Sequence, residues 1–105
     1  MNEPVAIQSG DYWVKVVEML QQNWALIEAD GQGAVRVHFI SDTSGVFDEM
    51  VFPSAYTAQA ALRRNGFRQF AKRDDLRAFL RPPSPPFRRR AHPNDPIYSS
   101  GRFRR

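Results

Sequence analysis

The side chains of this chain that could do chemistry are two histidines, eleven carboxylates and an excess of arginines. His38 stands near several of the carboxylates, and a histidine beside carboxylates can ligate a metal ion or act as a base. The second histidine, His92, is 54 positions away, so the sequence has neither an HxH nor an HxxxH spacing. Zinc sites usually contain ligands at such short spacings. We therefore expect no metal site and interpret His38 as a polar-face residue of a strand.

The remaining candidates for catalysis do not form a catalytic set. Asp48 and Glu49 are adjacent, so on a strand they point to opposite faces and cannot act together as acid and base. Ser99–Gly101 lacks the GxSxG turn of a nucleophile elbow. Gly31 and Gly33 lack the lysine and the following helix of a phosphate loop. We expect a protein that is not an enzyme and has no catalytic residue and no cofactor.

Charge divides the chain into two unlike parts. Residues 1–61 hold two basic and eight acidic side chains, a net charge of −6, whereas residues 62–105 hold thirteen basic and three acidic ones, a net charge of +10. All but one of those thirteen are arginine, whose planar fork of donors suits phosphates, carboxylates and aromatic faces. The basic part therefore either binds an external polyanion or folds against the acidic part of its own or a second copy.

Arginines alternate with aromatic side chains near the C-terminus. This pattern suits stacking on unpaired bases while guanidinium groups contact phosphates. An alternative is that Ile97, Tyr98 and Phe103 dock on the sheet of their own domain, and a second is that Pro83–Arg88 is a PxxPxR ligand of an SH3-type groove. The predicted residues for binding nucleic acid or a partner are Arg88, Arg89, Arg90, Tyr98, Arg102, Phe103, Arg104 and Arg105.

The elements that would position these residues begin with a predicted N-terminal helix. From Asp11, apolar residues recur at spacings of three and four as far as Trp24, and Ser9 or Asp11 could cap the helix. The alternative is a strand, because this segment is rich in β-branched and aromatic residues. Three strands follow, over 24–29, 34–40 and 46–52, with Gly31 and Gly33 suited to the first turn.

The sequence after Pro53 predicts helices and then a tail. Ser54 can cap a helix that ends at Asn65 and Gly66, and Asp74 or Asp75 can cap a shorter one. The predicted fold class is α+β: an N-terminal helix, a three-stranded antiparallel meander and C-terminal helices on one sheet face. Residues 1–80 would form this domain, and 81–105 a tail rich in proline and arginine that starts as a stiff polyproline spacer.

Three strings resemble those of a family of short, functionally uncharacterised bacterial proteins: residues 41–49, 61–67 and especially 92–103, which contains Ile-Tyr-Ser-Ser-Gly-Arg-Phe. The resemblance implies a bacterial, cytoplasmic protein and assigns no catalytic or ligand residues. The order helix, three strands, helix is also similar to that of double-stranded RNA-binding domains. Residues 54–60 are uncharged, however, where those domains carry lysines at the start of the last helix.

Composition excludes several further classes. A chain of 105 residues with 42% hydrophobic positions fits one domain, and the absence of cysteine excludes disulfides and thiol chemistry. No apolar run reaches the roughly 20 residues of a membrane span.

We expect a cytoplasmic protein with no membrane partner that binds nucleic acid, as a single strand or structured RNA, through its basic half. The alternative is a protein-interaction module whose tail pairs with an acidic surface of a partner or of itself.

Overall fold

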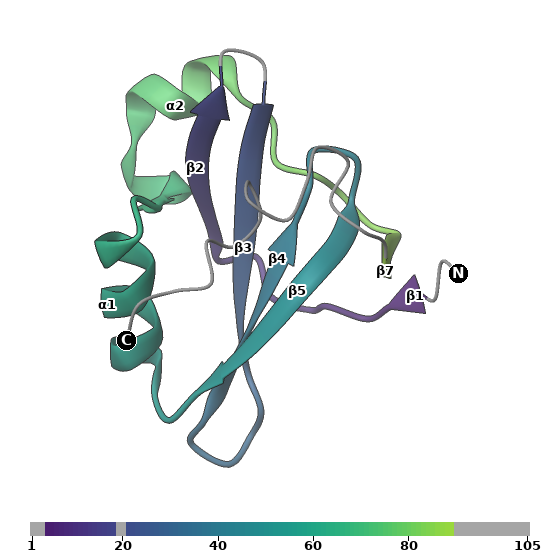
Figure 1. Cartoon of the computed structure of the whole chain (residues 1–105), viewed down its shortest axis with the longest axis vertical. Helices are drawn as coiled ribbons and strands as arrows, with labels where there is room; N and C mark the ends of the chain where they lie inside the picture. Colours follow the sequence, from purple (N-terminus) through teal and green to yellow (C-terminus); the bar gives the residue numbers. More distant parts are fainter. Residues whose placement is uncertain (1–3, 19–20, 90–105) are drawn as a thin grey trace.

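The computed structural model describes residues 4–18 and 21–89, and in this part of the chain a seven-stranded sheet dominates (Figure 1). The strand order is β1-β7-β5-β4-β3-β2-β6. Strands β2 to β5 form an antiparallel meander, β6 adds to its β2 edge, and β7 runs parallel to β5. The elements are β1 (Pro4–Val5), β2 (Tyr12–Glu18), β3 (Gln21–Ala29), β4 (Val35–Ile40), β5 (Gly45–Phe52), α1 (Ala55–Arg64), β6 (Arg68–Gln69), a 3₁₀ turn (Phe70–Lys72), α2 (Asp74–Phe79) and β7 (Phe87–Arg89).

The predicted N-terminal helix is wrong, because residues 12–18 and 21–29 are β2 and β3. Trp13 and Val14 are both buried, but on opposite faces of the sheet. A strand covered on both faces shows a nearly continuous apolar run instead of an alternation. The spacings of three and four between Asp11 and Trp24 therefore combine side chains of two strands. The β-branched and aromatic content, which was the basis of the strand alternative, is the better guide here.

The three-stranded meander and the single covered face are also corrected. The strands expected over 24–29, 34–40 and 46–52 are present as parts of β3, β4 and β5, but within a wider sheet. Helix α1 covers one face through Ala58, Ala61 and Leu62. The other face is covered by Phe70, Leu76 and Leu80 from the chain after β6, together with Phe87. The sheet is thus a middle layer between two apolar clusters.

Helix α1 has the ends that its sequence predicts. The hydroxyl of Ser54 accepts a hydrogen bond from the backbone N–H of Thr57 at 3.1 Å, and Thr57 bonds back to the backbone of Ser54. Asn65 is the C-cap, and Gly66 follows with a φ of 92°, a conformation that glycine adopts without strain. In α2, by contrast, Asp74 and Asp75 lie in the first turn and Arg73 is the N-cap.

The segment that begins at Arg81 is not only a spacer, because it ends in β7 and contributes to the core. Phe87 is 3% exposed and packs in the same cluster as Trp24. The Tyr12 hydroxyl donates to the carbonyl oxygen of Pro83 at 2.5 Å, and burial raises the pKa of Tyr12. The hydroxyl of Ser44 donates to the carbonyl oxygen of Ser84 at 2.7 Å. Strand β7 and these hydrogen bonds fix residues 83–89 on the sheet.

Candidate functional site

Two of the residues predicted to bind nucleic acid or a partner lie on β7. Arg88 and Arg89 have exposed side chains on this strand, opposite Gly45 and Val46 of β5. The guanidinium group of Arg89 donates to a carboxylate oxygen of Glu49 at 3.2 Å, and its side chain remains 48% exposed. The others, Arg90, Tyr98, Arg102, Phe103, Arg104 and Arg105, lie outside the described residues.

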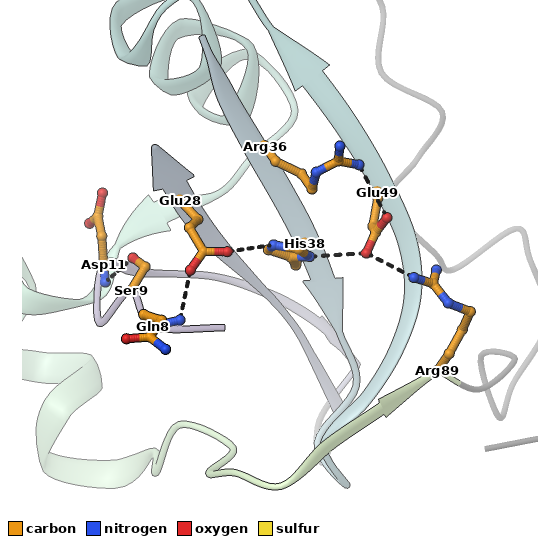
Figure 2. A network of polar contacts seen from close by, with 8 residues as sticks. All are labelled: Gln8, Ser9, Asp11, Glu28, Arg36, His38, Glu49 and Arg89. Atoms are coloured by element: carbon orange, nitrogen blue, oxygen red, sulfur yellow. Dashed lines mark hydrogen bonds and ion pairs between the residues drawn. The ribbon is translucent and has the colours of Figure 1, made fainter. Parts of the chain in front are cut away.

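Glu49 connects Arg89 to a polar network that is centred on the buried side chain of His38 (Figure 2). His38 is only 3% exposed, and both of its ring nitrogens face carboxylates. Its Nδ1 lies 3.1 Å from Oε2 of Glu49 and its Nε2 lies 3.2 Å from Oε1 of Glu28. The imidazole therefore bridges β3 and β5 across β4, the strand that carries it.

Each glutamate has a further partner on its far side. The other oxygen of Glu28 accepts a hydrogen bond from the backbone N–H of Gln8 at 2.7 Å. The other oxygen of Glu49 lies 3.4 Å from the guanidinium group of Arg36. The network thus joins three central strands to β7 and to the segment that leads into β2, as Figure 2 shows. We call these residues, Gln8, Glu28, Arg36, His38, Glu49 and Arg89, the histidine network.

The strand register places Glu28, Arg36, His38 and Glu49 on one face of the sheet. His38 lies directly opposite Glu49 on β5, and Arg36 lies opposite Glu28 on β3. Residues directly opposite each other in an antiparallel pair share a face. Asp48 pairs with Phe39, whose side chain lies on the other face. The adjacent carboxylates of Asp48 and Glu49 are therefore on opposite faces of the sheet.

The histidine network is held together by hydrogen bonds between paired polar groups. Each ring nitrogen of His38 lies within hydrogen-bond distance of one carboxylate oxygen, so both nitrogens of the ring are engaged. Buried charges are stable only when they are paired and hydrogen-bonded. With both nitrogens engaged, His38 has no lone pair directed at a substrate. Within residues 4–18 and 21–89, moreover, no group of three or more His, Asp or Glu side chains could hold a metal ion.

The sequence predicts a strand position for His38 but not its two partners. Counting outward from the turn at Gly31 and Gly33 pairs Glu28 with Arg36, which puts Glu28 diagonally opposite His38 and is the signal that could have found this one contact. The contact of Arg89 with Glu49 joins residues 40 positions apart, in a parallel pairing that no local pattern reports.

A groove of about 260 Å³ lies elsewhere, between the end of β5 and α1. Its lining contains no member of the histidine network and consists of Val51, Phe52, Pro53, Thr57, Ala61 and Arg64.

No helix in the described part of the chain has the length and apolar character needed to cross a membrane. Comparisons with protein-family models, with curated protein sequences and with solved structures find no match to this chain.

Proposed function

We propose that this is a small, non-enzymatic bacterial protein that binds nucleic acid, as a single strand or as structured RNA, through its basic C-terminal half. The observation that carries the proposal is the placement of Arg88 and Arg89. Their strand is held in the sheet by backbone pairing, while both side chains are exposed. Strand β7 thereby presents the start of an arginine run, Arg88–Arg90, from a fixed position on the domain. Arginines held in place lose less conformational entropy when they bind phosphates.

A second candidate function is supported by the ion pair between Arg89 and Glu49. This pair joins the basic half of the chain to its acidic half within one molecule. The same chemistry would allow the basic tail to pair with an acidic surface of a partner or of a second copy. In that case the protein is an assembly module, and nucleic acid competes with the acidic surface for the same arginines.

The proposal predicts a salt-dependent affinity that decreases when the arginine run is removed. Neutralising phosphates releases counterions, so the logarithm of the affinity for a single-stranded oligonucleotide should fall with the logarithm of salt by about 0.7 per phosphate contacted. Changing Arg88, Arg89 and Arg90 together to alanine should reduce this slope by about two. Changing Tyr98 and Phe103 should lower the affinity without changing the slope, because stacking involves no counterions. Fluorescence anisotropy over a salt series measures both quantities.

Since Arg89 also belongs to the histidine network, a variant with only Arg88 and Arg90 changed to glutamine is the control for folding. It keeps the contact with Glu49 and should reduce the slope by about 1.4. If the unchanged protein binds no tighter at low salt than the general non-specific range of about 10⁻⁴ to 10⁻⁶ M, the proposal is wrong and assembly takes its place.

A further inference from the structure

Three cationic side chains from separate elements meet at the C-terminal end of α1. The stem of Lys15, on β2, lies against Gly66 just after the helix. Arg63, in the last turn of α1, holds its guanidinium carbon 5.1 Å from the centre of the Trp13 ring. Arg68, on β6, donates to the carbonyl oxygens of Phe67 at 2.9 Å and Arg63 at 3.4 Å. We call Lys15, Arg63 and Arg68 the basic edge, because they lie where β2 and β6 end the sheet.

The basic edge has no carboxylate partners in the described part of the chain. Residues 50–73 contain five basic side chains and no aspartate or glutamate. Arg36, Arg73, Arg77 and Arg89 pair with carboxylates, whereas among residues 4–18 and 21–89 none of the three basic-edge residues forms such an ion pair. The carboxylate of Asp11 accepts a hydrogen bond from Gln69, the neighbour of Arg68 on β6, and forms no ion pair with the three basic-edge side chains. Positive charge therefore accumulates at this edge.

Helix energetics explain only part of this accumulation. Cations are favoured near a helix C-terminus, which accounts for Arg63, and the Arg68 guanidinium satisfies carbonyl groups at that end. Lys15 comes from β2, and among the described residues its ammonium group forms no hydrogen bond with the carbonyl groups at the helix end that its stem passes. Like charges brought together without a counter-charge cost free energy, and an anionic partner would remove that cost.

An exposed aromatic residue lies on the same face of α1 as Arg63. Tyr56 precedes Arg63 by seven residues, a spacing that places the two on one face about 10 Å apart along the helix axis. Its side chain is 78% exposed, so it contributes little to the core. Proteins that bind single strands combine cations along the phosphate backbone with aromatic rings on which bases stack. Tyr56 and the basic edge have this combination.

We propose that the basic edge binds the phosphate backbone of a single-stranded nucleic acid while a base stacks on Tyr56. This inference rests on the proposed function and adds a second contact surface to it. The basic edge lies at β6, and the arginines of the proposed function lie on β7. These two surfaces are separate, because β6 is five strand positions from β7, or about 24 Å at the usual strand spacing. One long strand can therefore contact both surfaces, and its affinity benefits from the high effective concentration of the second contact.

The test measures anisotropy of the full chain with a labelled single-stranded RNA of about 20 nucleotides over a salt series. Changing Lys15 and Arg63 together to glutamine should reduce the salt slope by about 1.4. Tyr56→Ala should weaken binding by about 5-fold to 100-fold with the slope unchanged, and Tyr56→Phe should bind as the unchanged protein does. Arg77→Gln is the matched charge control, because Arg77 already pairs with Asp74 and lies on α2, so its slope should stay the same.

Thermal unfolding of each variant separates folding from binding. Arg63 covers Trp13, so if the double variant unfolds, Lys15→Gln alone should still reduce the slope by about 0.7, and Arg63→Lys should retain the full slope. Slopes and affinities equal to those of the unchanged protein in the Lys15, Arg63 and Tyr56 variants would overturn this inference. If the Arg88, Arg89 and Arg90 variant lost binding in that same series, the proposed function would still stand. A chain that binds no RNA in any form contradicts both.

Discussion

A chain that ends at Leu80 should lose more unfolding free energy, relative to one that ends at Arg90, than the roughly 3 to 5 kcal/mol that a single buried phenylalanine contributes. The shorter chain lacks Phe87, which is buried in the cluster that contains Trp24 and Leu26. It also lacks β7, the strand that pairs with both β1 and β5. Chemical denaturation of the two chains, followed by tryptophan fluorescence, measures the difference.

Phe87→Ala in the full chain isolates the packing contribution and should by itself cost about 3 to 5 kcal/mol. The comparison also tests the domain boundary, which the sequence places at Leu80. If the chain ending at Leu80 unfolded with the same midpoint as the longer one, the boundary at Leu80 would be correct and β7 would add nothing to the core.

Replacing His38 by alanine should lower the free energy of unfolding by about 3 kcal/mol. The replacement leaves Glu28 and Glu49 facing each other across β4 without the ring that separates them and contacts both. Both glutamates keep some contact with solvent, which is why the lower end of the range for buried pairs applies. Urea denaturation at neutral pH gives the value.

Removing the two glutamate charges should restore part of the stability that the His38→Ala chain has lost. Adding Glu28→Gln and Glu49→Gln to the His38→Ala chain should recover part of the lost stability, because the uncompensated charges disappear. Val51→Ala is the matched control, since Val51 is an exposed residue of β5, and its effect should stay within about 0.5 kcal/mol. A His38→Ala chain as stable as this control would show that the histidine network contributes no stability.

The sequence correctly predicts the strands and the helix whose ends are marked by turn residues or helix-capping residues. Gly31 and Gly33 both have positive φ and mark the turn between β3 and β4, and Ser54 and Gly66 mark the two ends of α1. These signals depend on backbone conformations that few residue types adopt easily. The strands and the helix that they delimit could therefore be located without the structure.

The N-terminal strands could not be located because their pattern is ambiguous. Trp13 and Val14 are buried on opposite faces, and Trp24, which extends the apparent helical stripe, belongs to the neighbouring strand. Periodicity alone does not separate a strand buried on both faces from a helix. The wider sheet was missed for a related reason, since β7 consists of three residues after a run of prolines and is stabilised by partners distant in sequence.

The candidate site, too, could be predicted from the sequence only in part. Arg88 and Arg89 stand out by composition, and the structure places both on β7 with exposed side chains. The basic edge was not predictable, because Lys15 is separated from Arg63 and Arg68 by some fifty residues and only the fold unites them. A sequence shows the net charge of each segment, whereas a binding surface depends on which charged side chains lie next to each other in the folded protein.

The most direct test of nucleic-acid binding is purification of the full chain at low salt with and without nuclease treatment of the lysate. A binder of this kind should co-elute with nucleic acid in size-exclusion chromatography, with raised absorbance at 260 nm relative to 280 nm. Nuclease or high salt should remove that absorbance and shift the protein to later elution. A chain that elutes free of nucleic acid at low salt, in a position that nuclease does not change, would contradict nucleic-acid binding.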